Sequence, residues 1–151
     1  MEYTYKNGYR EGVVFAFIKE NTKILIEKRP VAGNQVEIFF PSGSIELKDY
    51  QGNSDYKHQA LIREVNEEFA GRIEVKNCIY LQEIWVESVN IVFYIYLITD
   101  WQGAMPEFTI EEGRKHSLLQ WIDLDERHLY FQFDSAFEIC NRIERYLNIS
   151  E

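Results

Sequence analysis

The sequence has few of the side chains that bind zinc or form disulfides. It contains two cysteines, Cys78 and Cys140, and three histidines, none of which stands in an HExxH arrangement. The cysteines are far apart and both fall within apolar patterns, so we expect buried, reduced thiols rather than a disulfide or a metal pair. The sequence also lacks a GxxxxGK[ST] loop and a GxSxG nucleophile elbow. Hydrolysis by a serine or at a zinc site is therefore not indicated.

Long apolar runs are missing as well. The longest run covers residues 91–98, which is too short to cross a bilayer. The first residues, MEYTYKNGYREG, lack the basic segment and the following apolar segment of a secretory signal. We therefore expect a cytoplasmic protein without a membrane partner.

Positive charge is scarce. The chain has 25 acidic and 16 basic residues, which gives a formal net charge of -9 at pH 7. A long polyanion would be repelled by such a protein, so extended nucleic acid is not an expected partner. A small phosphorylated ligand is not excluded, because a bound cation can reverse the local field in one cleft.

The length and the hydrophobic patterning predict one α/β domain that spans residues 1–151. Alternating or continuous apolar runs predict strands at residues 12–18, 24–28 (ending before Pro30), 36–40, 73–85, 91–101 and 118–122. Residues 49–54 and 103–113 are expected to form loops.

Two segments have helical periodicity. In the first, Leu61, Val65 and Phe69 are four residues apart and form an apolar stripe. Ser54 is its predicted N-cap, and Gly71 can supply the left-handed residue after its end. The second helix is expected to begin near Ser135, which would form a capping box with Glu138.

Three glutamates of the first helix stand at a spacing that favours metal binding. Glu64, Glu67 and Glu68 are at positions i, i+3 and i+4, so their carboxylates converge on one side of the helix. Their repulsion is relieved when a cation binds, and oxygen ligands without nearby sulfur or imidazole favour Mg²⁺ or Mn²⁺. A solvated helix face is the alternative, and it is the more common explanation for an isolated ExxEE pattern.

The surrounding residues resemble a known motif. Residues 63–71, REVNEEFAG, are similar to the REUxEExGU core of the Nudix box, in which U is an aliphatic residue. Residues 40–46, FPSGSIE, resemble the strand and loop that precede the helix of that box, and Ala60 matches a small helix residue. The chain thus resembles the MutT-like Nudix hydrolases. The resemblance implies an α/β/α sandwich around a mixed β-sheet, with a loop–helix–loop that binds metal and a diphosphate.

The resemblance also implies roles for individual residues. Glu67 and Glu68 would be metal ligands, and Glu64 would be a ligand or the base that activates water. Arg63 would hold a glutamate in position, and Glu64, Arg63 and Glu67 form the expected catalytic group. The backbone carbonyl of Ser42 or Gly43 could complete the coordination shell, so both residues are candidates for the metal site together with the glutamates.

Three further candidates lie outside the box. Family members often take another glutamate from the loop before the last strand, and of Glu111 and Glu112 we choose Glu112 as a metal ligand. A solvated loop acid is an equally good interpretation. Lys28 and Arg29 close the first predicted hairpin and could bind substrate phosphates, although both could be plain surface charges.

The sequence departs from the family motif at several positions. Counted back from Arg63, the position of a family glutamate is occupied by Asp55, and the spacer from Gly43 to Asp55 is six residues longer than in the family. Ala70 replaces the usual closing glycine, and Ser42 replaces a common first glycine. The carboxylates that would bind metal are unchanged.

These observations favour Mg²⁺-dependent hydrolysis of a phosphoanhydride bond in a nucleoside diphosphate linked to another moiety. Nucleoside triphosphates, nucleotide sugars and dinucleoside polyphosphates all fit this description. The alternative is a catalytically weak nucleotide-binding or protein-interaction module. Removal of messenger-RNA caps is disfavoured by the net charge, and homodimer formation stays open.

Overall fold

The central strand of the sheet is β2 (Tyr9–Lys19), in which residues 11–18 are all buried. Successive side chains of a strand point to opposite faces. Val13, Phe15 and Phe17 therefore join one apolar core, and Val14, Ala16 and Ile18 join another. A strand buried on both faces needs a covering layer on each side, and α1 (Tyr56–Glu68) and α2 (Asp134–Ser150) supply these layers.

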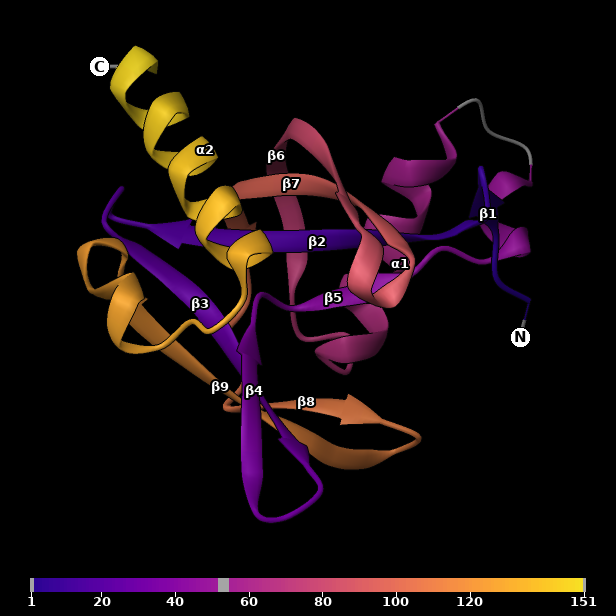
Figure 1. Ribbon diagram of the computed structural model, residues 1–151, viewed down its shortest axis with the longest axis horizontal. Helices are drawn as coiled ribbons and strands as arrows, with labels where there is room; N and C mark the ends of the chain where they lie inside the picture. Colours follow the sequence, from indigo (N-terminus) through magenta and orange to yellow (C-terminus); the bar gives the residue numbers. More distant parts are fainter. Residues whose placement is uncertain (1, 52–54, 151) are drawn as a thin grey trace.

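The computed structural model describes residues 2–51 and 55–150. The sheet runs in the order β6–β7–β2–β3–β9–β8 (Figure 1). β2 and β7 pair in parallel, whereas β2–β3, β3–β9 and β6–β7 are antiparallel, so the sheet is mixed. Its other strands are β1 (Tyr5–Lys6), β3 (Lys23–Val31), β4 (Gln35–Phe39), β5 (Ser42–Ser44), β6 (Glu74–Val86), β7 (Ile91–Gln102), β8 (Phe108–Glu111) and β9 (Arg114–Asp123).

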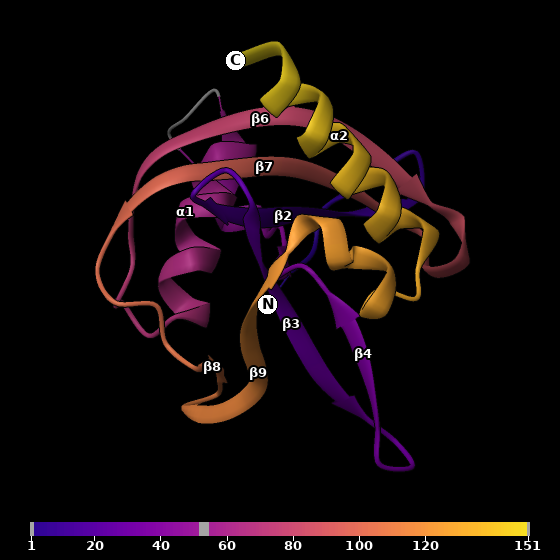
Figure 2. The ribbon, with the colours of Figure 1, turned by 90° about the vertical axis from the view of Figure 1, so that its left-hand side faces the viewer.

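The two helices lie on opposite sides of the sheet, as Figure 2 shows. The buried stripe of α1, Leu61 and Val65, continues into Phe69 and packs against Phe15 and Phe17. The buried stripe of α2 contains Ala136, Ile139, Cys140 and Ile143 and covers the other core. This arrangement is the predicted α/β/α sandwich. Within the described part of the chain, neither helix is both long and apolar enough to cross a bilayer.

The predicted ends of the first helix need one correction. The N-cap of α1 is Asp55, whose side chain accepts a hydrogen bond of 3.2 Å from the backbone of His58. Ser54, the predicted cap, lies outside the described residues. At the other end, Gly71 has the expected positive φ of 71°, and Ala70 shares this left-handed conformation at 53°. The left-handed residues end the helix.

The second helix begins earlier than predicted. α2 starts at Asp134, and the backbone NH groups of Ala136 and Phe137 donate to the carbonyl of Phe133. Ser135 therefore lies inside the first turn and cannot be the N-cap of the predicted capping box. Asp134 instead places a negative charge in the first turn, where it interacts favourably with the helix dipole.

The sheet is larger than the sequence pattern indicates. β3 continues through Pro30 to Val31, and the missing NH of Pro30 is tolerated because pairing with β9 ends at Lys28. Residues 108–111, part of a predicted loop, form β8 and pair with β9 across a tight turn. Pro106 and Gly113 on either side of this short strand produced a pattern typical of a loop.

Candidate active site

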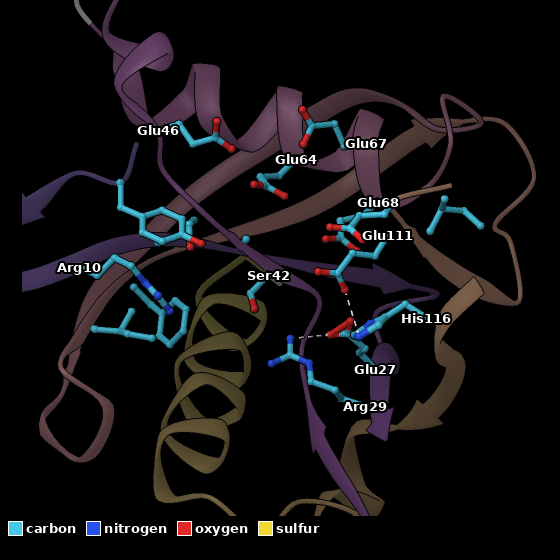
Figure 3. Close-up of a pocket in the computed structure, with 18 of the residues that line it drawn as sticks. Arg10, Glu27, Arg29, Ser42, Glu46, Glu64, Glu67, Glu68, Glu111 and His116 are labelled. Carbon is cyan, nitrogen blue, oxygen red and sulfur yellow. Dashed lines mark hydrogen bonds and ion pairs between the residues drawn. The ribbon is translucent and has the colours of Figure 1, made fainter. Parts of the chain in front are cut away.

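A cavity of about 690 Å³ opens where β3, β5, α1 and the β8–β9 hairpin meet (Figure 3). Its lining is rich in carboxylates, namely Glu27, Glu46, Glu64, Glu67, Glu68, Glu111 and Glu112. Ser42, Gly43 and Arg29 also line it. Most of the predicted site residues are thus brought to one cavity, together with acids that were not predicted.

Arg63 holds the acidic side chains of this site together. Its Nε and Nη2 donate to Asp49 Oδ1 and Oδ2, each at 2.8 Å, and Nη2 also donates to the carbonyl of Ser44 at 2.9 Å. Its Nη1 lies 3.0 Å from Glu64, 3.1 Å from Glu67 and 3.2 Å from Glu46. Arg63 can therefore position the glutamates without itself lining the cavity.

Asp49 corrects the alignment with the Nudix box. The side chain of Asp49 is 3% exposed within a short 3-10 helix, Leu47–Tyr50, where a surface loop was predicted. Counting the motif forward from Gly43 places its acidic residue at Asp49, whereas counting back from Arg63 placed it at Asp55. Because Asp49 contacts Arg63 and Asp55 caps α1, the six extra residues fall between Asp49 and Arg63.

The electrostatics of Asp49 agree with this position. Burial acts to raise the pKa of its carboxyl, but hydrogen bonds from Arg63 and from the backbone of Glu46 outweigh burial and hold the pKa below its usual range. The backbone of Glu46 donates to Asp49 Oδ2 at 2.8 Å, which closes a small turn. The ionised carboxylate of Asp49 is therefore a fixed partner of Arg63.

The three helix glutamates divide into two groups. Glu64 and Glu67 join Glu46, and each of the three offers a carboxylate oxygen within 4.8 Å of the others. Glu68 faces Glu27 and Glu111 instead, as Figure 3 shows. The predicted convergence therefore holds for Glu64 and Glu67, while Glu68 belongs to the second group.

Burial perturbs the acids of both groups. Burial raises the pKa of Glu64 to about 7, even though Arg63 acts in the opposite direction. Burial, followed by repulsion from Glu27, Glu64 and Glu111, raises the pKa of Glu68 to about 8. Closely spaced carboxylate oxygens in an acid-rich cavity fit a hard divalent cation, which would relieve this repulsion.

Gly43 allows β5 to approach α1. A Cβ built on Gly43 would overlap the carboxylate of Glu64. β5 itself is fixed by antiparallel pairing with β2, in which Gly43 is opposite Val13 and Ser42 is opposite Val14. The absence of a side chain at Gly43 therefore determines where Glu64 can lie.

The opposite wall of the cavity carries two cationic or ionisable side chains. Arg29 Nη2 lies 3.2 Å from Glu27 Oε1, and His116 Nε2 lies 3.0 Å from Glu111 Oε2. Burial raises the pKa of Glu27, in spite of the nearby Arg29. Arg29 and His116 thus face the acidic residues of α1 across the cavity.

Two sequence-based choices need comment. Lys28 does not line the cavity, because neighbouring strand residues point to opposite faces; its Nζ lies 5.8 Å from the centre of the Tyr130 ring. Of the predicted Lys28–Arg29 pair, only Arg29 is placed at the site. Glu112 lines the cavity from the β8–β9 turn with φ 51°, but Glu111 makes the contact with His116.

Several site residues were not predicted. Glu46 lies inside the FPSGSIE segment, so its position after β5 was an available indication. Glu27 is a single acid within an apolar strand, 3% exposed, and such a buried charge is unusual enough to suggest a function. Counting the motif forward from Gly43 was an available indication of Asp49, whereas no sequence pattern indicated His116.

Solved structures share this fold. No family model matches the sequence, and neither does any curated protein. A MutT structure described for the fish pathogen Aliivibrio salmonicida and for Vibrio cholerae has a TM-score of 0.66 and 23% identity, covering 88% of this chain and 94% of that chain. A MutT Nudix hydrolase from Burkholderia pseudomallei has a TM-score of 0.64 and 20% identity, covering 88% and 96%. An ADP compounds hydrolase has a TM-score of 0.67 and 16% identity, covering 99% and 77%. This chain has the fold of the Nudix hydrolases.

Proposed function

We propose that this protein is a Mg²⁺- or Mn²⁺-dependent pyrophosphohydrolase. Its substrate would be a nucleoside diphosphate linked to another moiety, such as a nucleoside triphosphate or a nucleotide sugar. The observation that carries the proposal is the gathering of Glu46, Glu64 and Glu67 by Arg63, on a fold shared with MutT proteins and an ADP compounds hydrolase.

The donor set of the site suits a divalent cation. Glu46, Glu64 and Glu67 would hold it through carboxylate oxygens, and the carbonyl of Ser42 or Gly43 could add a ligand. Glu68, with Glu27 and Glu111 beside it, offers further oxygens, and Glu112 lies at the cavity rim. When bound, such a cation polarises phosphate oxygens and lowers the pKa of a coordinated water.

The remaining steps fall to residues of the chain. Glu64 is our candidate for the proton acceptor, at one of its carboxylate oxygens, because it is buried in the cavity and held by Arg63. Arg63 would keep that carboxylate oriented through its own anchor on Asp49. Arg29 could donate to substrate phosphate oxygens, since a guanidinium fork matches their geometry.

The experiment is a screen of diphosphate compounds with Mg²⁺, with Mn²⁺ and with excess EDTA, read out by chromatographic detection of the nucleotide product. We expect turnover of at least one class, loss of turnover in EDTA, and loss in Glu67→Gln. Glu74→Gln serves as the control, because Glu74 is an exposed acid of β6 that does not line the cavity. Full activity in EDTA would contradict a metal-dependent site. Metal-dependent nucleotide binding without turnover would instead support the non-catalytic binding module.

A further inference from the structure

The cavity has two chemically different ends. Glu68 and Glu111 lie at one end and Arg10 at the other (Figure 3). Tyr3 and Ile91 adjoin Arg10, and Gly12 pairs with Phe93; all four line the cavity. In Figure 3, Ser42 lies between Arg10 on one side and Glu111 and His116 on the other. The lining around Arg10 is thus rich in aromatic rings, whereas the lining around Glu68 is rich in carboxylates.

Arg10 has hydrogen-bonding capacity that the protein does not use. Its Nε is buried without a hydrogen-bond partner, and Arg10 forms no ion pair within residues 2–51 and 55–150. Arg29 also has a buried Nε without a partner, but its Nη2 contacts Glu27, and Arg63 is surrounded by carboxylates. Because Arg10 lines the cavity, a ligand that accepts from its guanidinium would supply a hydrogen-bond partner that the protein does not.

Aromatic rings lie beside Arg10. The Cζ atom of Arg10 is 4.9 Å from the centre of the Tyr3 ring. Tyr3 is 38% exposed and is held near the site by a backbone bridge to Glu46. The guanidinium plane and the ring can therefore both offer a flat surface to a planar ligand.

Gly12 brings a second ring to the same end. Gly12 is paired with Phe93 across the parallel β2–β7 ladder. A Cβ on Gly12 would lie 3.1 Å from two atoms of the Phe93 ring and 3.2 Å from the carbonyl of Gly43. Any side chain at position 12 would therefore crowd the Phe93 ring. Phe93 itself lines the cavity.

We propose that Tyr3, Arg10, Gly12 and Phe93 form a base-binding subsite that prefers a 6-oxopurine, such as guanine or hypoxanthine, over adenine. The inference rests on the proposed function, because the diphosphate of the same ligand would lie at the acidic end. Aromatic and guanidinium planes stack on nucleobases. The guanidinium of arginine has only hydrogen-bond donors, so it matches the O6 and N7 acceptors of a 6-oxopurine. The 6-amino group of adenine is also a donor and cannot pair with it.

The test compares ligands that differ in one position. Inosine and adenosine nucleotides differ at the 6-substituent, so we would measure the dissociation constants of GDP, IDP, ADP and inorganic pyrophosphate by calorimetry with Mg²⁺. We expect GDP and IDP to bind roughly tenfold more tightly than ADP, the factor that one good bidentate contact supplies. Equal affinity for IDP and ADP, or no measurable binding of any nucleotide, would overturn the proposal.

Variants identify the residues responsible. Arg10→Gln should bring IDP and ADP within about twofold of each other and leave pyrophosphate binding unchanged. Tyr3→Ala should weaken all three nucleotides without affecting pyrophosphate, because it removes a stacking surface. Arg72→Gln is the control, since Arg72 is exposed and does not line the cavity. Equal weakening of pyrophosphate by Arg10→Gln would show that Arg10 binds phosphate, which would refute a base contact.

These outcomes are separate from those of the hydrolysis screen. Binding of a diphosphate is measured without cleavage, so the preference for IDP over ADP can be present in a protein that hydrolyses nothing. In that case the proposed function would fail while the subsite stands. If the protein hydrolyses diphosphates but binds IDP and ADP equally well, the proposed function stands and the base-binding subsite is refuted.

Discussion

The guanidinium of Arg63 and the carboxylate of Asp49 meet through two hydrogen bonds of 2.8 Å each, although fourteen positions of sequence separate the two residues. Both side chains are largely buried, with exposed fractions of 15% for Arg63 and 3% for Asp49. The pair ties the short 3-10 helix before the six extra residues to α1 after them. Because Asp49 fixes the guanidinium of Arg63, it also helps to fix the positions of Glu64 and Glu67, which Arg63 contacts.

Asp49→Asn should destabilise the protein and reduce turnover. The amide keeps one acceptor but loses the charge and one bond to Arg63, so we expect a loss of about 2 kcal/mol in the free energy of unfolding. Asp55→Asn is the matched control, because asparagine caps a helix as well as aspartate does. Urea unfolding measures the stability, and the rate at which the nucleotide product forms measures turnover. Equal losses in both variants would contradict the assignment of Asp49 as the motif acid.

Glu67→Gln should separate metal binding from stability. Glu67 is 49% exposed and its contacts with Arg63 and Lys48 are solvent-accessible, so the metal-free variant should unfold within about 0.5 kcal/mol of the wild type. Mg²⁺ should raise the Tm of the wild type, since a ligand of the folded state stabilises it, but raise that of the variant far less. Turnover should fall by roughly a hundredfold. A normal rate together with an unchanged Mg²⁺ shift would rule Glu67 out as a ligand.

Gly43→Ala should disturb the site through Glu64. The added methyl group would occupy the position of the Glu64 carboxylate, so the glutamate or β5 must move. We expect a stability cost of about 1–3 kcal/mol, typical of overpacking, and a large loss of turnover. Ser44→Ala, in the same strand, keeps the carbonyl that accepts from Arg63 and should behave as the wild type. Thermal melting with and without Mg²⁺, beside initial rates, tests this; full activity of Gly43→Ala would contradict the crowding argument.

Glu11 should make stability depend on pH. Burial acts to raise its pKa, but hydrogen bonds from Tyr94, Tyr56 and Tyr50 outweigh burial and lower the pKa below the usual 4.5. The folded state therefore binds this proton less readily than the unfolded state, and the stability gained is present above pH 4.5 and lost as the pH falls through the folded pKa. Urea unfolding of wild type and Glu11→Gln over this range should show a difference at neutral pH that shrinks on acidification. A difference that grows on acidification would reverse the assigned direction.

The parts of the site that could be predicted are those with local geometry. Glu64 and Glu67 lie one helical turn apart, so helical spacing alone places them together, and Arg63 is adjacent to them in sequence. The apolar stripe of α1 was visible for the same reason. The sequence did not distinguish Arg29 from Lys28. Only Arg29 lines the cavity, because the pairing of β3 with β9 determines which face of β3 meets it.

The other residues depend on contacts between distant segments. Counting from the two ends of the motif gives two different acids, Asp49 and Asp55, and the contact between Asp49 and Arg63 decides between them. Glu27, His116 and Glu111 come from β3, β9 and β8, and β8 itself is too short to give a clear alternation. Tertiary packing, rather than local propensity, determines each of these positions.

The stacked rings of Tyr50 and Tyr56, 4.1 Å apart at their centres, have a consequence for how this motif can change over time. Both hydroxyls donate to the buried carboxylate of Glu11, so the residues on the two sides of the inserted stretch are held together at one point. The length of what is inserted there is thereby uncoupled from the geometry of Asp49 and α1. Natural variation, or a peptide tag inserted by an experimenter, can therefore lengthen the motif at this point without moving Asp49 relative to Arg63.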